Sequence, residues 1–355
     1  MLTALLHRLF PPVPSIDGDT FILWEPCSKS HGEIIPGYAS YLLALGYKVV
    51  VLMTPARIPE GLFCRFSHPR LTLTRLSQRR IRRFMRSAEV RKAAGVMVST
   101  VGKLGDTRDG QVDLQAVFGP QRPRRLILVD HDVEARVKAG SWDPSTVTLR
   151  AIDGLASRVV NPHDFGPVAE HPKNGDRTVL VMVGAVRDKR RNQNLVYEAL
   201  ERLVAAGKTG FELRLIGKPG KDEIPETLRP HVVKVGYVDF RQLYAEVEAA
   251  DFLVTSFQRD NENHAPYRTT KTSGTFQLSY GFSTPCIVQR AFAAGTAFTE
   301  GNALFYDDDA QMRDALEKAI DMPADAYADM TAALRADARR LYYASLANMR
   351  ILTSA

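Results

Sequence analysis

A short turn rich in hydroxyl groups, Lys271-Thr-Ser-Gly-Thr275, has the residue types best suited to ligand binding in this chain. The residues after it have the pattern of an amphipathic helix, which we expect to end at Gly281, before a buried strand that follows Pro285. Ser273 and Gly274 then stand where a helix leaves its first N–H groups unpaired, so the turn can hold an anion such as a phosphate. Lys271 adds a positive charge. An ordinary helix cap uses the same residue types, and the motif alone does not separate the two.

Apolar runs separated by helical segments predict the elements that carry such turns. In the first half, β-branched and aromatic runs predict strands over residues 20–24, 48–53, 71–73, 95–99, 125–130 and 157–161, with a helix over 34–45. Gly46 closes that helix at a C′ position. In the second half, strands are predicted over 178–183, 211–216, 232–235, 251–256 and 303–306, with helices over 194–206, 240–249 and 309–320. This alternation indicates an α/β fold with parallel, doubly wound sheets.

Residues 161–176 are rich in Pro, Gly and polar side chains and have no periodicity, which is typical of an interdomain linker. The linker predicts an N-terminal domain over residues 1–165 and a second domain over 166–325. Residues 326–355 have alanine and leucine at helical spacing and predict one or two closing helices.

Composition excludes several classes of protein. With 355 residues, of which 45% are hydrophobic and 25% charged, the chain is long enough for two globular domains. No apolar run approaches the roughly 20 residues of a membrane span, and the first residues lack the pattern of a signal peptide. The 3 cysteines have no metal or redox spacing, which favours a reducing cytoplasm. No metal-binding constellation is expected, because residues 307–309 fit a helix cap. No Gly-x-Gly-x-x-Gly motif follows the first strand, which argues against a nicotinamide or flavin cofactor.

The net charge of +7 is concentrated in one segment that runs from Arg75 to Lys92. It holds eight basic residues, with Glu89 as the single acid, and apolar residues at positions that would form one face of a helix. Three interpretations compete: a solvated helix face, a contact with anionic lipid headgroups, and a nucleic-acid patch. Nucleic acid is the least favoured of the three, because no nucleic-acid motif accompanies the segment.

A succession of short motifs in the second half resembles the donor domain of GT-B glycosyltransferases, sugar transferases with two Rossmann-like domains. The motifs are a strand and turn at Val183-Gly184, a basic loop before a helix, a Leu-x-Ile-Gly strand end at Gly217, a Gly-Tyr-Val turn at 236–238, and a Gly-x-x-x-Pro turn at 281–285. His31-Gly32 after the first strand is a weaker likeness. The resemblance implies a GT-B fold in which the two domains face a cleft and the C-terminal helices pack back on the N-terminal domain.

The chain departs from that family at one position pair. Many retaining members carry two glutamates with seven residues between them before the Gly-x-Pro turn, where they bind the sugar and the ribose. Those places hold Arg268 and Phe276 here, and neither side chain accepts a hydrogen bond as a carboxylate does. Other groups must therefore bind the donor hydroxyls.

The resemblance also implies which residues would bind a nucleotide-sugar donor. Positive side chains and a helix N-terminus at the carboxyl ends of parallel strands can stabilise a leaving diphosphate. A solvated surface loop is the alternative for each group. The expected donor-binding residues are Gly184, Arg187, Arg190 and Arg191 on one loop, Glu262 and His264 on a second, and Lys271, Ser273, Gly274 and Thr275 in the turn.

The acceptor side is expected in the first domain, where His31 follows the first strand. It stands where a general base can deprotonate an acceptor hydroxyl. Asp130 and His131 end the strand predicted over 125–130, and such a pair can act as orienter and base. Histidines at these places also serve as caps or core residues.

Together these features predict a cytoplasmic glycosyltransferase that needs no cofactor beyond its nucleotide-sugar substrate. It would transfer a sugar to a hydroxyl of a glycan or lipid-linked acceptor, at the inner face of a membrane that the basic segment contacts. A nucleotide-sugar epimerase, a polysaccharide pyruvyl transferase and a non-catalytic binding protein that uses the basic segment are the alternatives.

Overall fold

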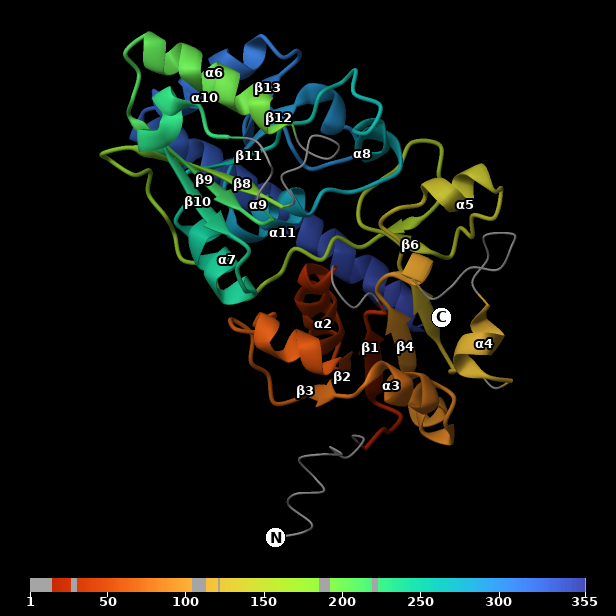
Figure 1. Cartoon of the computed structure of the whole chain (residues 1–355). Helices are drawn as coiled ribbons and strands as arrows, with labels where there is room; N and C mark the ends of the chain where they lie inside the picture. Colours follow the sequence, from red (N-terminus) through yellow and green to blue (C-terminus); the bar gives the residue numbers. More distant parts are fainter. Residues whose placement is uncertain are drawn as a thin grey trace. The chain divides into compact units, whose positions relative to one another are not determined.

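The structure is a computed structural model that describes residues 15–26, 31–103, 113–120, 122–184, 192–218 and 223–354. The chain divides into two compact units (Figure 1). Unit 1 comprises residues Met1–Gly166 and Tyr342–Ala355, and unit 2 comprises Pro167–Leu341. The long helix α11 (Ala324–Ser354) is a single element that contributes to both units.

Unit 1 is built on a five-stranded parallel sheet in the order β3-β2-β1-β4-β5. Its three central strands, β2, β1 and β4, are buried, as their runs of Val, Leu and Ile predict for a sheet covered on both faces, whereas the edge strand β3 is largely exposed. A short parallel pair, β6 with β7, follows the sheet. The strands are β1 (Thr20–Trp24), β2 (Lys48–Met53), β3 (Leu71–Arg75), β4 (Gly95–Val98), β5 (Leu126–Leu128), β6 (Val147–Thr148) and β7 (Arg158–Val159).

Helices connect these strands, and the two longest of them bury their apolar residues. The helix predicted over 34–45 is α2 (Ile35–Ala44), and Gly46 adopts the left-handed conformation expected after a helix, with φ of 97°. The basic segment forms α3 (Gln78–Met85) and the 3-10 helix Ala88–Lys92. The other helices are α4 (Leu114–Phe118), α5 (Glu134–Lys138) and the 3-10 helices Gly32–Ile34, Pro55–Glu60 and Val101–Lys103.

The C-terminal part of α11 packs on unit 1 through side chains near its end. The hydroxyl of Ser345 accepts a hydrogen bond from the backbone N–H of Asn161 at 3.0 Å. The Asn348 amide donates to the carbonyl of Val159 at 2.9 Å.

Among the helices in the described part of the chain, none is both long and apolar enough to cross a membrane.

Unit 2 has a six-stranded parallel sheet in the order β10-β9-β8-β11-β12-β13. β8 is the first strand of unit 2 in the sequence. The next two strands, β9 and β10, are added on one side of it and the last three on the other side, so the strand order reverses between β8 and β11. The strands are β8 (Thr178–Val183), β9 (Phe211–Ile216), β10 (Val232–Gly236), β11 (Phe252–Val254), β12 (Cys286–Gln289) and β13 (Ala303–Tyr306). The helices are α6 (Gln193–Ala205), α7 (Phe240–Glu248), α8 (Ala265–Thr269), α9 (Gly274–Phe282), α10 (Gln311–Ile320) and the 3-10 helices Glu226–His231 and Arg290–Phe292.

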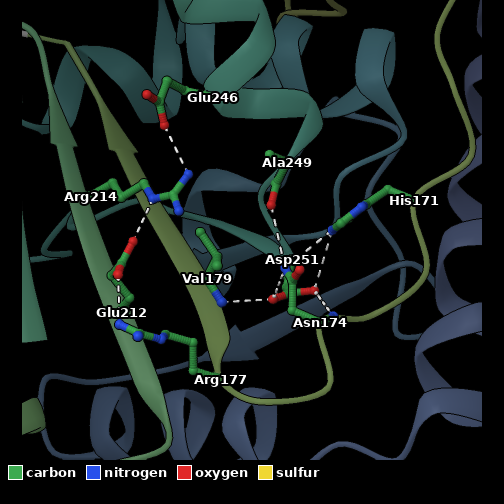
Figure 2. A network of polar contacts seen from close by, with 9 residues as sticks. All are labelled: His171, Asn174, Arg177, Val179, Glu212, Arg214, Glu246, Ala249 and Asp251. Carbon is green, nitrogen blue, oxygen red and sulfur yellow. Dashed lines mark hydrogen bonds and ion pairs between the residues drawn. The ribbon is translucent and has the colours of Figure 1, made fainter.

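The segment that leads into unit 2 is bound to the amino ends of the strands β8 and β11 by the buried carboxylate of Asp251 (Figure 2). Asp251 accepts hydrogen bonds from the backbone N–H groups of Val179 at 2.6 Å and Asn174 at 2.9 Å, and from the Asn174 amide at 2.9 Å. His171 lies 3.8 Å from the same carboxylate. Beside it, Arg214 bridges Glu212 and Glu246 (Figure 2). Because this network lies at the amino ends of β8 and β11, it stabilises the entry to unit 2 at the edge opposite the predicted donor residues.

Candidate active site

The hydroxyl-rich turn of unit 2 begins α9 as the sequence predicts. Ser273 is the N-cap, and its buried hydroxyl accepts a hydrogen bond from the backbone N–H of Thr275 at 3.3 Å. Because α9 connects the parallel strands β11 and β12, its N-terminus lies at the carboxyl edge of the sheet. The predicted helix end at Gly281 is wrong: α9 continues to Phe282, and Ser283 takes the left-handed conformation with φ of 54°. This helix end therefore uses a non-glycine residue where glycine is the usual choice.

A second helix N-terminus meets the same edge. Asn192 caps α6, with its side-chain oxygen accepting from the N–H of Leu195 at 3.3 Å. The Asn192 backbone N–H donates to the carbonyl of Ser256 at 3.4 Å, and its amide donates to Gln258 at 2.8 Å. The cap of α6 is thus joined to the segment after β11, where the strand order of the sheet reverses. Open parallel sheets bind ligands at such a point.

Two buried polar side chains at this edge were missed by the sequence analysis. Ser256 lies two residues after the end of β11 and is 0% exposed, and Gln277 lies in the second turn of α9 and is 2% exposed. The Ser256 hydroxyl and the Gln277 amide nitrogen have no hydrogen-bond partner among the described residues. An unpaired buried polar group costs about 1–3 kcal/mol, so a ligand oxygen that pairs with it recovers that free energy. Their types gave no signal in the sequence, since Ser and Gln are common throughout.

The loop between β11 and α9 places its predicted residues differently. Glu262 is exposed, whereas His264 is fully buried. The Nδ1 atom of His264 accepts a hydrogen bond from the backbone N–H of Gln258 at 2.9 Å, and its ring packs against Phe257. His264 therefore holds the loop in place. Lys271 is half-buried, and its backbone N–H donates to the Pro266 carbonyl at 2.7 Å. The predicted Arg187, Arg190 and Arg191 lie outside the described residues.

A cavity of about 640 Å³ opens at the carboxyl ends of β11, β12 and β13. Its lining is almost entirely polar and consists of Gln258, Arg259, Asp260, Asn261, Gln289, Asp307, Asp308, Asp309 and Ala310. Of residues 307–309, which were predicted to cap the next helix, Asp308 accepts a hydrogen bond from the N–H of Gln311, the first residue of α10, at 2.9 Å, although the N-cap position itself is Ala310. Within the described ranges, no three or more His, Cys, Asp or Glu side chains are grouped to hold a metal ion.

Three neighbouring strands of unit 2 end in glycines with positive φ. Gly184 follows β8 with φ of 119°, Gly217 follows β9 with φ of 131°, and Gly236 ends β10 with φ of 80°. Gly217 donates its N–H to the Gly236 carbonyl at 2.8 Å, and a Cβ on Gly217 would overlap the Gly184 carbonyl oxygen. The three glycines form a surface without side chains at the carboxyl edge, which we call the glycine floor. Tyr237 projects beside it and is 71% exposed.

In unit 1, the structure brings two predicted histidines together. The rings of His31, after β1, and His131, after β5, lie with centroids 4.0 Å apart and planes inclined by 44°. Both are half-buried. His31 has φ of 62° and ψ of 17°, the left-handed conformation that few non-glycine residues adopt. Such a conformation persists where the surroundings enforce it, which is often at a functional site.

Buried carboxylates lie at the carboxyl ends of neighbouring strands of unit 1. Glu25, after β1, accepts hydrogen bonds from the hydroxyls of Ser99 at 2.8 Å and Thr100 at 2.6 Å, both after β4. Asp130, after β5, accepts from the Arg136 guanidinium at 3.1 Å and from the Asp132 backbone N–H at 3.2 Å. The sequence predicted that Asp130 pairs with His131, but the Asp130 carboxylate is engaged by Arg136. Sequence patterns could not reveal Glu25, Ser99, Thr100 or Arg136, because their contacts are between elements.

Burial raises the pKa of the Asp130 carboxyl to about 6, and this effect outweighs the hydrogen bond from Asp132 and the attraction of Arg136. The carboxyl is therefore ionised above about pH 6, where its ion pair with Arg136 is complete, and increasingly protonated below it. The pair ties α5, which carries Arg136, to the end of β5. It thereby fixes the segment that begins with His131.

Comparison with known proteins bears on the fold. The sequence matches no protein-family model and no curated protein. The structure is similar to that of Anabaena HepE in complex with UDP-glucose, with a TM-score of 0.60 and 12% identity over 95% of this chain and 100% of that one. It is also similar to AviGT4, a glycosyltransferase involved in avilamycin A biosynthesis, with a TM-score of 0.55 and 16% identity over 95% of this chain and 98% of that one.

WaaG, a glycosyltransferase involved in lipopolysaccharide biosynthesis, is similar with a TM-score of 0.51 and 12% identity over 95% of this chain and 100% of that one. These matches extend over both units. The chain has the GT-B fold. The predicted fold class, α/β with two Rossmann-like domains, is thus confirmed. The described members of the two predicted sets lie at the carboxyl edges of the two sheets, the expected donor residues in unit 2 and the expected acceptor residues in unit 1.

Proposed function

We propose that the protein is a glycosyltransferase that transfers a sugar from a nucleotide-sugar donor to a hydroxyl of a glycan or lipid-linked acceptor. The observation that carries this proposal is the position of two helix N-termini, those of α6 and α9, at the carboxyl edge of the unit 2 sheet, with the cap of α6 joined to Ser256 where the strand order reverses. Such a place suits a diphosphate, because unpaired N–H groups and helix dipoles stabilise negative charge. Anabaena HepE, which has the same fold, has been solved with UDP-glucose bound.

The donor would lie along the carboxyl edge of the unit 2 sheet. Its diphosphate would contact the N-terminus of α9, with Lys271 adding a positive charge as the sugar leaves. Its base would rest on the glycine floor and stack on Tyr237, since base–aromatic stacking contributes about 1–3 kcal/mol per base. The unpaired groups of Ser256 and Gln277 offer hydrogen bonds to donor hydroxyls. They would replace in part the two glutamates whose places hold Arg268 and Phe276.

The acceptor would bind at the carboxyl edge of the unit 1 sheet. There His31 would accept the proton of the attacking hydroxyl, with the ring of His131 packed against it. Asp130 would act through Arg136 by holding the segment that carries His131. It is therefore a positioning residue and not the partner of His131.

Donor binding can be tested by thermal denaturation with UDP-, GDP-, CMP-, ADP- and dTDP-sugars. A ligand present at 100 times its dissociation constant that binds only the folded state adds about 2.7 kcal/mol to the free energy of unfolding. We expect one nucleotide to raise the melting temperature of the wild type, and Lys271→Ala and Tyr237→Ala to weaken that rise. Lys318→Ala, which removes an exposed charge from α10, is the matched control and should respond like the wild type. A flat response to every donor would contradict the proposal.

The exposed face of α3 is proposed to contact anionic lipid and so to bring the enzyme to a lipid-linked acceptor. Its apolar residues Ile81, Phe84 and Met85 are buried in the core of unit 1. The exposed stripe Arg79, Arg82, Arg83 and Arg86 faces the other way. Apart from Arg86, their side chains make no hydrogen bond or ion pair to a described residue. The apolar side is therefore not available for insertion, and binding would be electrostatic.

This contact predicts that the protein sediments with vesicles containing phosphatidylglycerol and not with vesicles of phosphatidylcholine alone. Each basic residue near an anionic surface contributes about 1 kcal/mol, so replacing Arg79, Arg82 and Arg83 together by Ala should weaken binding about 100-fold. The control replaces three exposed cations of unit 2, namely Arg229, Lys234 and Arg241. Equal binding by the two triple variants, or binding of the wild type to duplex DNA but not to vesicles, would overturn the assignment.

A further inference from the structure

Residues 131–146 form an excursion from the carboxyl edge of the unit 1 sheet. The excursion leaves the sheet at Asp130 and returns at Val147, where the Asp130 N–H donates to the Val147 carbonyl at 2.9 Å and Val129 forms a parallel bridge with Val147. Because it leaves and returns at the same point, everything within it lies beyond the end of β5. It begins with His131 and contains α5, which is labelled in Figure 1. Any acceptor bound near the two histidines therefore lies near this excursion.

Trp142 lies in this excursion and is held by its polar edge. Its indole N–H donates to the carbonyl of Ala156 at 2.9 Å, and the side chain is only half-buried. The ring stacks on no other aromatic ring of the described residues. Its neighbours are fixed as well: Ser141 donates its N–H to the Arg136 carbonyl at 2.9 Å, and Asp143 accepts from the N–H of Ser145 at 2.8 Å. The indole is thus a flat apolar surface in a fixed place.

The surroundings of Trp142 define the kind of ligand that fits it. The other tryptophan of the chain, Trp24, is 3% exposed and belongs to the core, whereas Trp142 has no such role. Val137, on α5 in the same excursion, is 42% exposed and adds apolar surface. Asp143 is the next residue in the sequence. One of its carboxylate oxygens accepts from Ser145, and the other can accept a hydrogen bond from a hydroxyl. A flat apolar ring with a carboxylate on the next residue suits a pyranose, whose C–H face is apolar and whose rim carries hydroxyls.

We propose that Trp142 is a platform for a sugar ring of a glycan acceptor, in a subsite next to the sugar that receives the new bond. This inference rests on the proposed function, since it names the acceptor class of the same enzyme. The second sugar would stack on the indole while the first presents its hydroxyl to the histidine pair. An acceptor of two or more sugars would then bind more tightly than a single sugar, with little change in the rate of the bound complex.

Tryptophan fluorescence tests the platform without any transfer reaction. The wild-type emission, from which the emission of Trp142→Phe is subtracted, reports on Trp142 because Trp24 is buried. We expect a blue shift or quench on titration with at least one of maltotriose, cellotriose and chitotriose, since stacking on a C–H face tolerates different sugars. Titration to about 100 mM detects even a weak subsite. An emission that does not change with any of the three trisaccharides overturns the proposal.

Kinetics with the full-length enzyme provide the second test. Loss of the ring in Trp142→Ala should raise KM for an oligosaccharide acceptor about 10-fold, with kcat and donor affinity unchanged. Trp142→Phe keeps an aromatic face and should restore most of the affinity. Tyr343→Ala truncates another exposed aromatic side chain of unit 1 and should leave KM unchanged.

The two tests separate this inference from the proposed function. If donors bind and transfer proceeds, but Trp142→Ala leaves KM unchanged, the platform is refuted and the glycosyltransferase stands. If no donor binds, but a trisaccharide changes the Trp142 emission, the proposed transfer fails and the sugar platform stands.

Discussion

Replacing His31 is expected to lower kcat by about 10²–10⁴-fold, the contribution of a positioned general base. The expected donor affinity is unchanged, because His31 lies in unit 1 and the proposed donor residues lie in unit 2. His31→Asn is the informative variant. Asparagine tolerates the left-handed backbone that His31 adopts, so its loss of activity reports the imidazole and not backbone strain. Single-turnover rates with saturating donor, together with donor binding by calorimetry, measure the two quantities separately.

The packing of His31 on His131 sharpens this test. If the two rings act as a unit, the double variant His31→Asn with His131→Ala should be little worse than the more damaged single variant. Independent roles would give losses that multiply. His68→Ala serves as the control, because its Nδ1 atom only accepts from the Arg70 N–H in the loop before β3. A His31→Asn enzyme with wild-type kcat would remove His31 from the chemistry.

The second large effect is expected at Gly217, where the glycine floor leaves no room for a side chain. In Gly217→Ala the new Cβ would overlap the carbonyl oxygen of Gly184, on a backbone with φ of 131° that other residues avoid. The ends of β8 and β9 would therefore have to shift at the carboxyl edge of the sheet. We expect a loss of more than about 3 kcal/mol in the free energy of unfolding, above the usual range for a single substitution, and loss of donor binding.

Gly207→Ala is the matched control for this substitution. Gly207 follows α6 with φ of 82°, and a Cβ there would meet no atom within 4 Å. It should therefore lose only about 1–2 kcal/mol, the cost of the left-handed conformation alone. Urea unfolding of the three proteins, followed by circular dichroism, gives the comparison. Equal destabilisation by the two substitutions would show that the contact with Gly184 does not matter.

Local patterns in the sequence determined much of the architecture. Buried runs of β-branched residues predicted the strands of both sheets, and their alternation with helices predicted parallel sheets wound on both faces. Signals within one turn were also informative: Ser273 caps α9, and Gly46 follows α2 with positive φ, as predicted. The end of α9 was missed, because Ser283 adopts a conformation for which glycine is the usual signal.

The sequence by itself thus determined the elements and the fold class, because those depend on residues close together in the chain. Only the tertiary structure decided the partners within the site. It placed His31 beside His131, engaged Asp130 with Arg136, buried His264 within the loop between β11 and α9, and aligned Gly184, Gly217 and Gly236. These contacts join residues on different strands or loops. They follow from strand order and from the space left by neighbouring side chains, neither of which a local pattern records.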